Sequence, residues 1–416
     1  MTACIGENMY FYGLKYFRPQ NMKRLYILLF IITTGLTSIH ATDHTPQVSL
    51  LTAAPGDMTY ELFGHTGIRV RMAGNNPARH LDIVYHYGLF DFSAPHFLYR
   101  FVKGETDYSI GAIDYKSFVN SYIWRGSTVY EQPLNLTLEE TERLLRALDE
   151  NMRPENRIYR YNFFYDNCAT RPRDKIEEAL TDNLTYDRSD TTAVTFRELI
   201  HRCTAGHPWL TFGIDLALGA PLDHPATYRE QMFLPHLLMQ AFDDATITTA
   251  DGEKRALTGI TQSHSGGSRQ PVAPTPFTPT VVFYLLLIAV IAVSVWEYRR
   301  GKQFRLIDIA ICGLYGLFGA VLFFLIFIST HPATSPNYTA LWCHPLLWLV
   351  MLSLIAAPRK MITNRLMSIV LLATIATLIA MPFLPQLFQP AFYPLAAIPG
   401  IRALTHLEVE MKNGRL

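Results

Sequence analysis

A thiol and an imidazole are the side chains of this chain best suited to nucleophilic chemistry. Cys168 lies in the stretch Tyr161-Asn-Phe-Phe-Tyr-Asp-Asn-Cys-Ala-Thr-Arg171, where an aromatic strand is expected to lead into a helix from Cys168 to about Leu180. Asp166 or Asn167 can cap that helix by accepting a hydrogen bond from a backbone N–H. The first helical turn favours an anion, so the thiol is predicted to have a lowered pKa. Packing at a helix start is the alternative role, because free cysteines are often buried.

The base for such a thiol is predicted from a β-hairpin. Residues 64–72 and 81–90 alternate between apolar and polar side chains, and the loop signal Gly74-Asn-Asn-Pro77 separates them. If the apolar faces coincide, His65 lies opposite an even-numbered residue near 86 or 88. His65 and His86 then share one face at one end of the hairpin.

A thiol–imidazole pair needs a base and a polar group that orients the base. We therefore predict Cys168 as nucleophile, His65 as base and His86 as the orienting residue, with Tyr87 and Asp91 as alternatives for the third role. A histidine at a strand start is more commonly a surface or hydrogen-bonded residue, so the residues alone leave this pairing open.

Other chemistries have weaker support in the sequence. His201, Cys203 and His207 could bind zinc, but no C-x-x-C or H-E-x-x-H motif accompanies them. There is no G-x-S-x-G nucleophile elbow, Walker A loop or G-x-G-x-x-G fingerprint. The formal net charge of +1 gives no argument for a nucleic-acid partner. No metal or cofactor is therefore expected.

The start of the chain indicates export. Residues 22–41 combine a basic n-region, an apolar core and the small-residue end Ser38-Ile-His-Ala41, which is typical of a signal peptide. Residues 1–21 fit no targeting pattern, so Met22 is a possible true start. An uncleaved anchor is the alternative, and in both cases the following domain is exported.

Residues 45–250 are expected to form an exported α+β domain with a small antiparallel sheet. Short helices are predicted at 95–103 and 115–124, and Thr137-Leu-Glu-Glu140 is a capping box that opens another helix. The Pro-, Gly- and Ser-rich residues 251–280 are expected to be a linker.

Residues 281–407 are expected to form an all-α transmembrane bundle of four or five helices. Four apolar stretches are long enough to span a bilayer, and a fifth contains Arg402. The stretches are 281–298, 306–328, 338–357, 366–388 and, as the fifth, 391–407. The basic loops at 299–305 and 359–365 are expected on the cytoplasmic side, and the loop at 329–338, which has no Lys or Arg, outside.

The outer loop carries polar side chains at a membrane end. His331 and Asn337 are candidates for the wall of a lipid-facing substrate site, since polar groups near membrane spans are costly. An ordinary interfacial loop is the alternative. Arg171 and Asn167, beside the thiol, are further candidates for substrate binding.

The motifs resemble those of a bacterial lipoprotein N-acyltransferase family that joins an exported domain to a multi-span membrane domain. Five segments carry the resemblance. They are Leu50-Leu-Thr-Ala-Ala-Pro-Gly-Asp57, Phe63-Gly-His-Thr-Gly-Ile-Arg69, Tyr87-Gly-Leu-Phe-Asp-Phe92, Tyr130-Glu-Gln132 and Tyr161–Arg171. The order of His before Cys also resembles circularly permuted papain-like folds such as that of lecithin:retinol acyltransferase.

By this resemblance, Cys168 accepts an acyl group as a thioester and His65 is the base. The implied reaction transfers that acyl group to the α-amine of the N-terminal cysteine of a diacylated lipoprotein, in the periplasm at the inner membrane. The donor would be a membrane phospholipid or an ester of the lipoprotein itself. Two alternatives stay open: a membrane-anchored thiol peptidase or amidase acting on the cell wall, and a non-catalytic envelope assembly factor.

Overall fold

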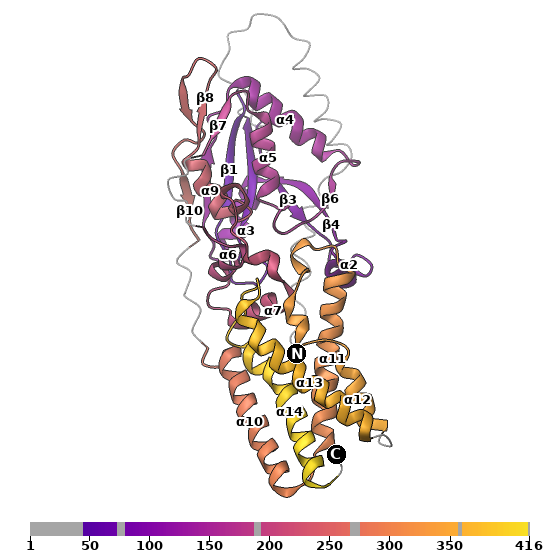
Figure 1. Cartoon of the computed structure of the whole chain (residues 1–416). Coiled ribbons are helices and arrows are strands. Elements are labelled where there is room, and N and C mark those ends of the chain that lie inside the picture. Colours follow the sequence, from indigo (N-terminus) through magenta and orange to yellow (C-terminus); the bar gives the residue numbers. More distant parts are fainter. Residues whose placement is uncertain (1–44, 73–79, 187–192, 267–274, 357–359, 415–416) are drawn as a thin grey trace, which may run out of the picture.

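The computed structural model describes residues 45–414 except 73–79, 187–192, 267–274 and 357–359. An α+β domain precedes a helical C-terminal region, and the two parts lie end to end (Figure 1). The predicted signal peptide at 22–41 lies outside the described residues.

The α+β domain is built on an antiparallel sheet of seven strands in the order β10-β5-β1-β2-β3-β4-β6. In chain order the strands are β1 (Gln47–Ala53), β2 (His65–Met72), β3 (Leu81–Leu89), β4 (Asp107–Asp114), β5 (Val129–Pro133), β6 (Ile158–Arg160) and β10 (Gln262–His264). In the β2–β3 hairpin, Gly67 pairs with His86 and Ile68 with Tyr85. The predicted hairpin and its register are therefore confirmed.

Helices cover both faces of this sheet. On one face, α4 (Leu138–Met152), α5 (Thr170–Ala179) and α9 (Pro235–Asp243) pack on a core that includes Leu50 and Ile68. On the other face, α3 (Tyr115–Ile123) covers Leu51 and Val84. The alternation along the strands produces these two cores, since successive side chains point to opposite faces. The capping box of Thr137 and Glu140 is present at the start of α4, as predicted.

The prediction that residues 251–280 form a linker is wrong for the first half of this range. β9 (Lys254–Ala256) completes a second sheet with β7 (Asn183–Thr185) and β8 (Thr246–Thr248), and β10 pairs with β5. Strands of three residues are too short to show the alternation by which a strand is recognised in sequence.

A group of short helices lies between the main sheet and the membrane helices. It comprises α6 (Phe196–Cys203), α7 (Pro208–Ala217), the 3₁₀ helix η2 (Ala220–Asp223) and α8 (Tyr228–Gln231). Their apolar core includes Phe196 and also Ala333 of the membrane part, so these helices join the two parts.

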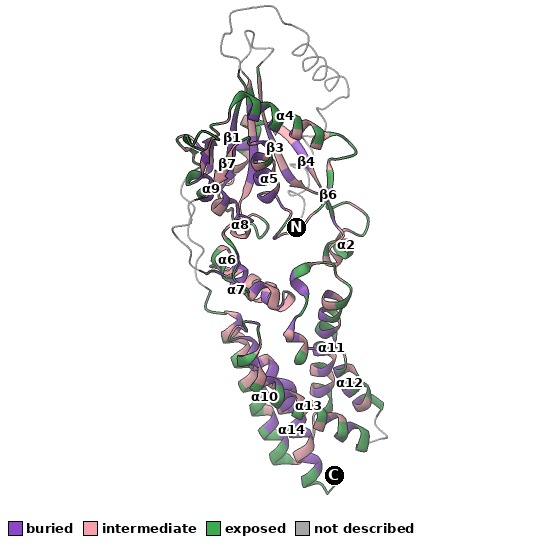
Figure 2. Ribbon diagram, turned by 45° about the horizontal axis from the view of Figure 1, so that its top comes forward, coloured by how far each residue is buried: buried purple, intermediate pink, exposed green. Residues whose placement is uncertain are grey.

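The C-terminal region contains α10 (Pro279–Arg300), α11 (Arg305–Phe327), α12 (Leu347–Ala356), α13 (Lys360–Ala380) and α14 (Phe392–Lys412), with short 3₁₀ helices η3 (Pro332–Thr334), η4 (Tyr338–Leu341) and η5 (Met381–Phe383). Among the described helices, α10, α11 and α13 are long and apolar enough to cross a membrane. Their outward faces are widely exposed, which is expected of surfaces that face lipid (Figure 2).

α14 contributes a buried positive charge to the helical region. Arg402 is buried, donates to Asp308 of α11 at 2.7 Å and to Ser294 of α10 at 3.0 Å, and lies 2.7 Å from Glu297. The ion pairs therefore join α14 to two membrane helices and satisfy the guanidinium away from lipid.

Candidate active site

Cys168 and His65 both lie next to Gly88. A side-chain carbon added to Gly88 would lie 3.5 Å from Cβ of Cys168 and 3.9 Å from Cε1 of His65. Gly88 has φ of 94°, and the β3–β4 register shifts between His86 and Leu89. This β-bulge opens the end of β3, so that the turn carrying Cys168 approaches the start of β2.

The start of β2 positions His65. Gly64, with φ of 77°, precedes it, and an added Cβ there would lie 2.7 Å from the carbonyl oxygen of Ala53. Only a glycine allows both that backbone conformation and that approach of β1. His65 is therefore held at the last residue pair of the β1–β2 ladder, opposite Ala53.

His86 contacts the imidazole of His65, as predicted from the hairpin register. Nε2 of His65 and Nδ1 of His86 are 3.3 Å apart. The rings of Phe118 and Tyr122 from α3 lie 6.4 Å and 6.3 Å from the His65 ring. The hydrogen bond and the aromatic wall together restrict the orientation of the His65 ring.

Cys168 lies in the turn before α5 and not in its first turn, because α5 begins at Thr170. The predicted helix start is thus two residues early. Asn167 provides the predicted cap: its Oδ1 accepts hydrogen bonds from the backbone N–H groups of Ala169 and Thr170 at 2.7 Å and 2.9 Å. The cap presents Cys168 at the N-terminal end of the helix.

The predicted lowered pKa of Cys168 is wrong for this state of the site. Burial raises the pKa of the thiol to about 11, although the backbone N–H groups of Thr66 and of Cys168 itself oppose this by hydrogen bonding to the sulfur. Burial also lowers the pKa of His65 to about 3, with His86 and Arg125 as further causes, and that of His86 to about 4. Desolvation thus outweighs the helix dipole, and thiol and imidazoles are all neutral at pH 7.

These pKa values predict how Cys168 is alkylated. With the pKa raised, the thiolate fraction at pH 7 is roughly 10⁻⁴, and it grows about tenfold per pH unit. The rate of carboxamidomethylation of Cys168, followed by mass spectrometry of its peptide, should therefore still rise at pH 9.5. It should show no inflection near pH 6.5, since His65 does not titrate there. A rate that levels off below pH 7 would mean a thiolate–imidazolium pair instead.

Arg171 and Asn167 do not present free groups to a substrate in this structure. Arg171 forms a two-point ion pair with Asp166 at 2.5 Å and 2.8 Å, and its guanidinium lies 3.6 Å from the centre of the Tyr159 ring. Asn167 is buried, and its amide nitrogen donates to the carbonyl oxygens of Phe163 and Phe233. Both residues shape the turn around Cys168, and their substrate contacts stay a prediction.

His331 and Asn337 lie at the junction of the two parts of the chain. His331 Nε2 is 2.8 Å from the carbonyl oxygen of Phe101. Asn337 is buried and donates to the carbonyl oxygen of Leu216 at 3.0 Å, and its Oδ1 accepts from Thr339 and from Gln386. These contacts fasten the outer loop to the α+β domain, and a role of the two residues in a substrate site stays a prediction.

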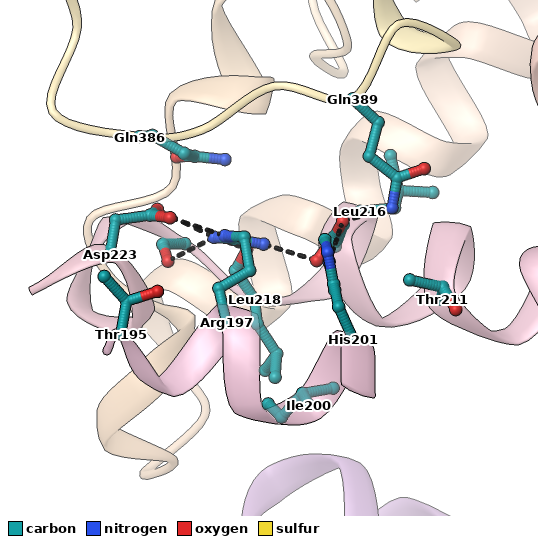
Figure 3. Close-up of polar contacts among 12 residues, drawn as sticks. Thr195, Arg197, Ile200, His201, Thr211, Leu216, Leu218, Asp223, Gln386 and Gln389 are labelled. Carbon is teal, nitrogen blue, oxygen red and sulfur yellow. Dashed lines mark hydrogen bonds and ion pairs between the residues drawn. The ribbon is translucent and has the colours of Figure 1, made fainter. Parts of the chain in front are cut away.

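A buried charge network that no sequence pattern predicted lies at that junction (Figure 3). Arg197 of α6 is fully buried and pairs with Asp215 at 2.6 Å and with Asp223 at 2.7 Å. Asp215 also contacts His201 and Gln389, the latter from the segment before α14. A charged residue on an amphipathic helix resembles a solvated face in sequence, so nothing local indicates that it is buried.

Within the part of the chain that the structure describes, no three His, Cys, Asp or Glu side chains gather to hold a metal ion. His201, the first residue of the possible zinc set, uses Nε2 to contact Asp215 at 2.8 Å. The geometry at Gly88 therefore remains the arrangement best suited to catalysis by the described side chains.

Two family models match the chain, one in each part. The first, described as the Lnb N-terminal periplasmic domain, matches residues 40–202. The second, described as the Lnb transmembrane domain, matches residues 271–413. No curated protein and no solved structure shows a significant match. The first match contains both Cys168 and His65, and the second contains all five helices of the C-terminal region.

Proposed function

Since the chain belongs to the Lnb family, a multi-pass membrane family with a periplasmic N-terminal domain, we propose that it is a lipoprotein N-acyltransferase with Cys168 as nucleophile. The observation that carries this proposal is the meeting of Cys168 and His65 at Gly88. A thiol beside an imidazole suits acyl transfer, because a thioester divides one difficult step into two easier ones. The acceptor would be the α-amine of a diacylated lipoprotein, and the donor an acyl ester of the outer leaflet.

The first half-reaction forms the acyl-enzyme. The sulfur of Cys168 attacks the ester carbonyl carbon and forms the C–S bond, while His65 takes the thiol proton. The C–O bond of the ester then breaks, and His65 gives the proton to the leaving alcohol. Nδ1 of His65 is the nitrogen for this transfer, because Nε2 is engaged by His86.

The second half-reaction releases the product. The lipoprotein amine attacks the thioester, the C–N bond forms and the C–S bond breaks. His65 takes a proton from the amine and returns it to the sulfur. The backbone N–H groups of Thr66 and Cys168, which point to the sulfur, are the candidate donors for the tetrahedral oxyanion.

The neutral resting pair fits this mechanism. The raised pKa keeps the Cys168 thiol largely protonated before a substrate binds, and proton transfer to His65 then accompanies attack on the bound ester. The family's location also fits, since both donor and acceptor lipids lie in the leaflet beneath the periplasmic domain.

We further propose a permuted papain-like fold and five membrane spans. The order of a histidine strand before a cysteine helix, with α5 packed on β2 and β3, supports the fold. For the spans, α12 and α14 would add to the three candidates. The contacts of α14 with α10 and α13, and the paired Arg402, support its place inside the bundle.

Expression of the chain in a bacterium that lacks lipoprotein N-acyltransferase activity tests the function. Mass spectrometry of lipoprotein N-terminal peptides should show the added mass of one acyl chain on the α-amine. Unchanged diacylated N-termini despite correct membrane insertion would contradict the acyltransferase proposal. Altered peptidoglycan stems in the same cells would support a cell-wall hydrolase instead.

A further inference from the structure

The segment that follows the active-site glycine is unusually apolar and exposed. Beyond Gly88 the chain continues through Phe90 and Phe92 into α2 (Phe97–Lys103), which has no buried residue. Phe92 is 70% exposed and Leu98 is 73% exposed. Exposed apolar side chains that lie next to one another mark a docking surface more often than scattered ones do.

α2 is fastened to the outer end of a membrane helix. The residues that follow α11 form three hydrogen bonds to backbone carbonyl oxygens of α2. They are Ser329 to Val102 at 2.9 Å, Thr330 to Lys103 at 2.9 Å, and His331 to Phe101 at 2.8 Å. Figures 1 and 2 both place α2 beside the upper end of α11. α2 therefore lies at the depth at which α11 leaves the membrane.

The exposed faces of the two helices are continuous. The Tyr99 ring is 5.9 Å from the Phe324 ring of α11, and Phe327, at the end of that helix, is 69% exposed. Lipid that covers Phe327 would also reach α2. The charges of α2 are paired within the domain, Arg100 with Asp107 at 2.6 Å and Lys103 with Glu105 at 2.7 Å, so the side chains available to lipid are chiefly apolar.

A series of aromatic contacts leads from α2 back to the thiol. Successive ring centres are 5.7 Å apart from Phe97 to Phe90, 5.0 Å from Phe90 to Tyr108, and 4.2 Å from Tyr108 to Tyr161. Tyr108 and Tyr161 pack in the same core as Ala169, the residue after Cys168, and a charge on the sulfur raises the pKa of both tyrosines. The rings thus form an apolar path between the outer end of α11 and Cys168.

We propose that Phe92, Leu98, Tyr99 and Phe101 form a lipid-docking face that lies in the outer leaflet, and that phospholipid acyl chains pass from it along the aromatic path to Cys168. Aromatic and aliphatic side chains at this depth are typical of interfacial helices. The docking itself does not depend on the proposed function, whereas the route to Cys168 rests on it.

Photo-crosslinking of the full chain in phospholipid nanodiscs tests the docking. The photoreactive residue p-benzoylphenylalanine would replace Leu98, or Leu138 as a matched control, which is 55% exposed at the start of α4, away from the membrane helices. We expect a phospholipid adduct at position 98 with roughly tenfold higher yield than at 138, as burial of a leucine-sized side chain in lipid implies. Equal yields at the two positions, or an adduct only with added lipoprotein, would overturn the docking face.

A second variant tests the route. Leu98→Asp should slow acylation of Cys168 by phospholipid roughly tenfold, with the same rate of iodoacetamide alkylation as the wild type, and Leu138→Asp should change neither. Equal acylation by Leu98→Asp and wild type would overturn the route. If the variant with p-benzoylphenylalanine at position 98 forms the lipid adduct while the wild type acylates neither Cys168 nor the lipoprotein, the docking face stands and the proposed function fails.

Discussion

Replacing Cys168 by alanine is expected to reduce lipoprotein N-acylation by at least about 10³-fold, because loss of a covalent nucleophile removes the whole two-step pathway. The readout is mass spectrometry of lipoprotein N-terminal peptides after reaction of purified enzyme with a diacylated lipoprotein in phospholipid vesicles. Cys168→Ser should be similarly impaired, since a neutral imidazole activates a serine hydroxyl poorly without a site built for it.

Cys203→Ser is the matched control for this prediction. Cys203 is the other cysteine of the described α+β domain, it is half-buried, and burial raises the pKa of its thiol to about 11 as well. The two thiols therefore resemble each other in ionisation, but only Cys168 has the proposed partner His65 beside it at Gly88. Undiminished N-acylation by Cys168→Ala would contradict the nucleophile assignment.

Replacing His65 by glutamine is expected to reduce the acylation rate by roughly 10²–10⁴-fold, the usual contribution of a general base. Glutamine preserves much of the side-chain volume but cannot shuttle the thiol proton. The loss should appear in the rate of acyl-enzyme formation under single-turnover conditions. His80→Gln, at the exposed opposite end of the hairpin, should leave the rate unchanged.

Two substitutions of His86 test whether it orients the His65 base. For Nδ1 of His65 to accept the thiol proton, Nε2 must carry a hydrogen and donate to Nδ1 of His86. Asparagine supplies an acceptor oxygen, so His86→Asn should retain more activity than His86→Leu. Equal activity of these two variants would mean that His86 does not orient the base.

Local sequence signals were sufficient to predict the hairpin that carries His65 and His86. Alternation specified which residues of β2 and β3 share a face, and a slip of one residue would have turned His65 away from His86. The cap at Asn167 was also predictable, because capping side chains act on the backbone two or three residues away.

Contacts between distant segments were not predictable. The thiol's raised pKa depends on packing around Cys168, which no local pattern reports. The tertiary fold brings Arg197 into ion pairs with Asp215 and Asp223. It also lets Asn337 donate a hydrogen bond to Leu216 across the two parts of the chain. The contacts of His331 and Asn337 were not predictable for the same reason: polar side chains near a membrane fasten a junction as readily as they bind a substrate.

Capture of the acyl-enzyme tests the central claim most directly. The enzyme is incubated with phospholipid, or with a diacylated lipoprotein whose α-amine has been blocked, so that no acceptor amine is present; it is then digested at acidic pH and analysed by mass spectrometry. We expect an acyl mass on the Cys168 peptide that is removed by neutral hydroxylamine and is absent from the Cys203 peptide. When an acceptor is added, the acyl group should be transferred to the lipoprotein amine. Formation of N-acylated lipoprotein in a single turnover, with Cys168 remaining a free thiol at every time point, would contradict it.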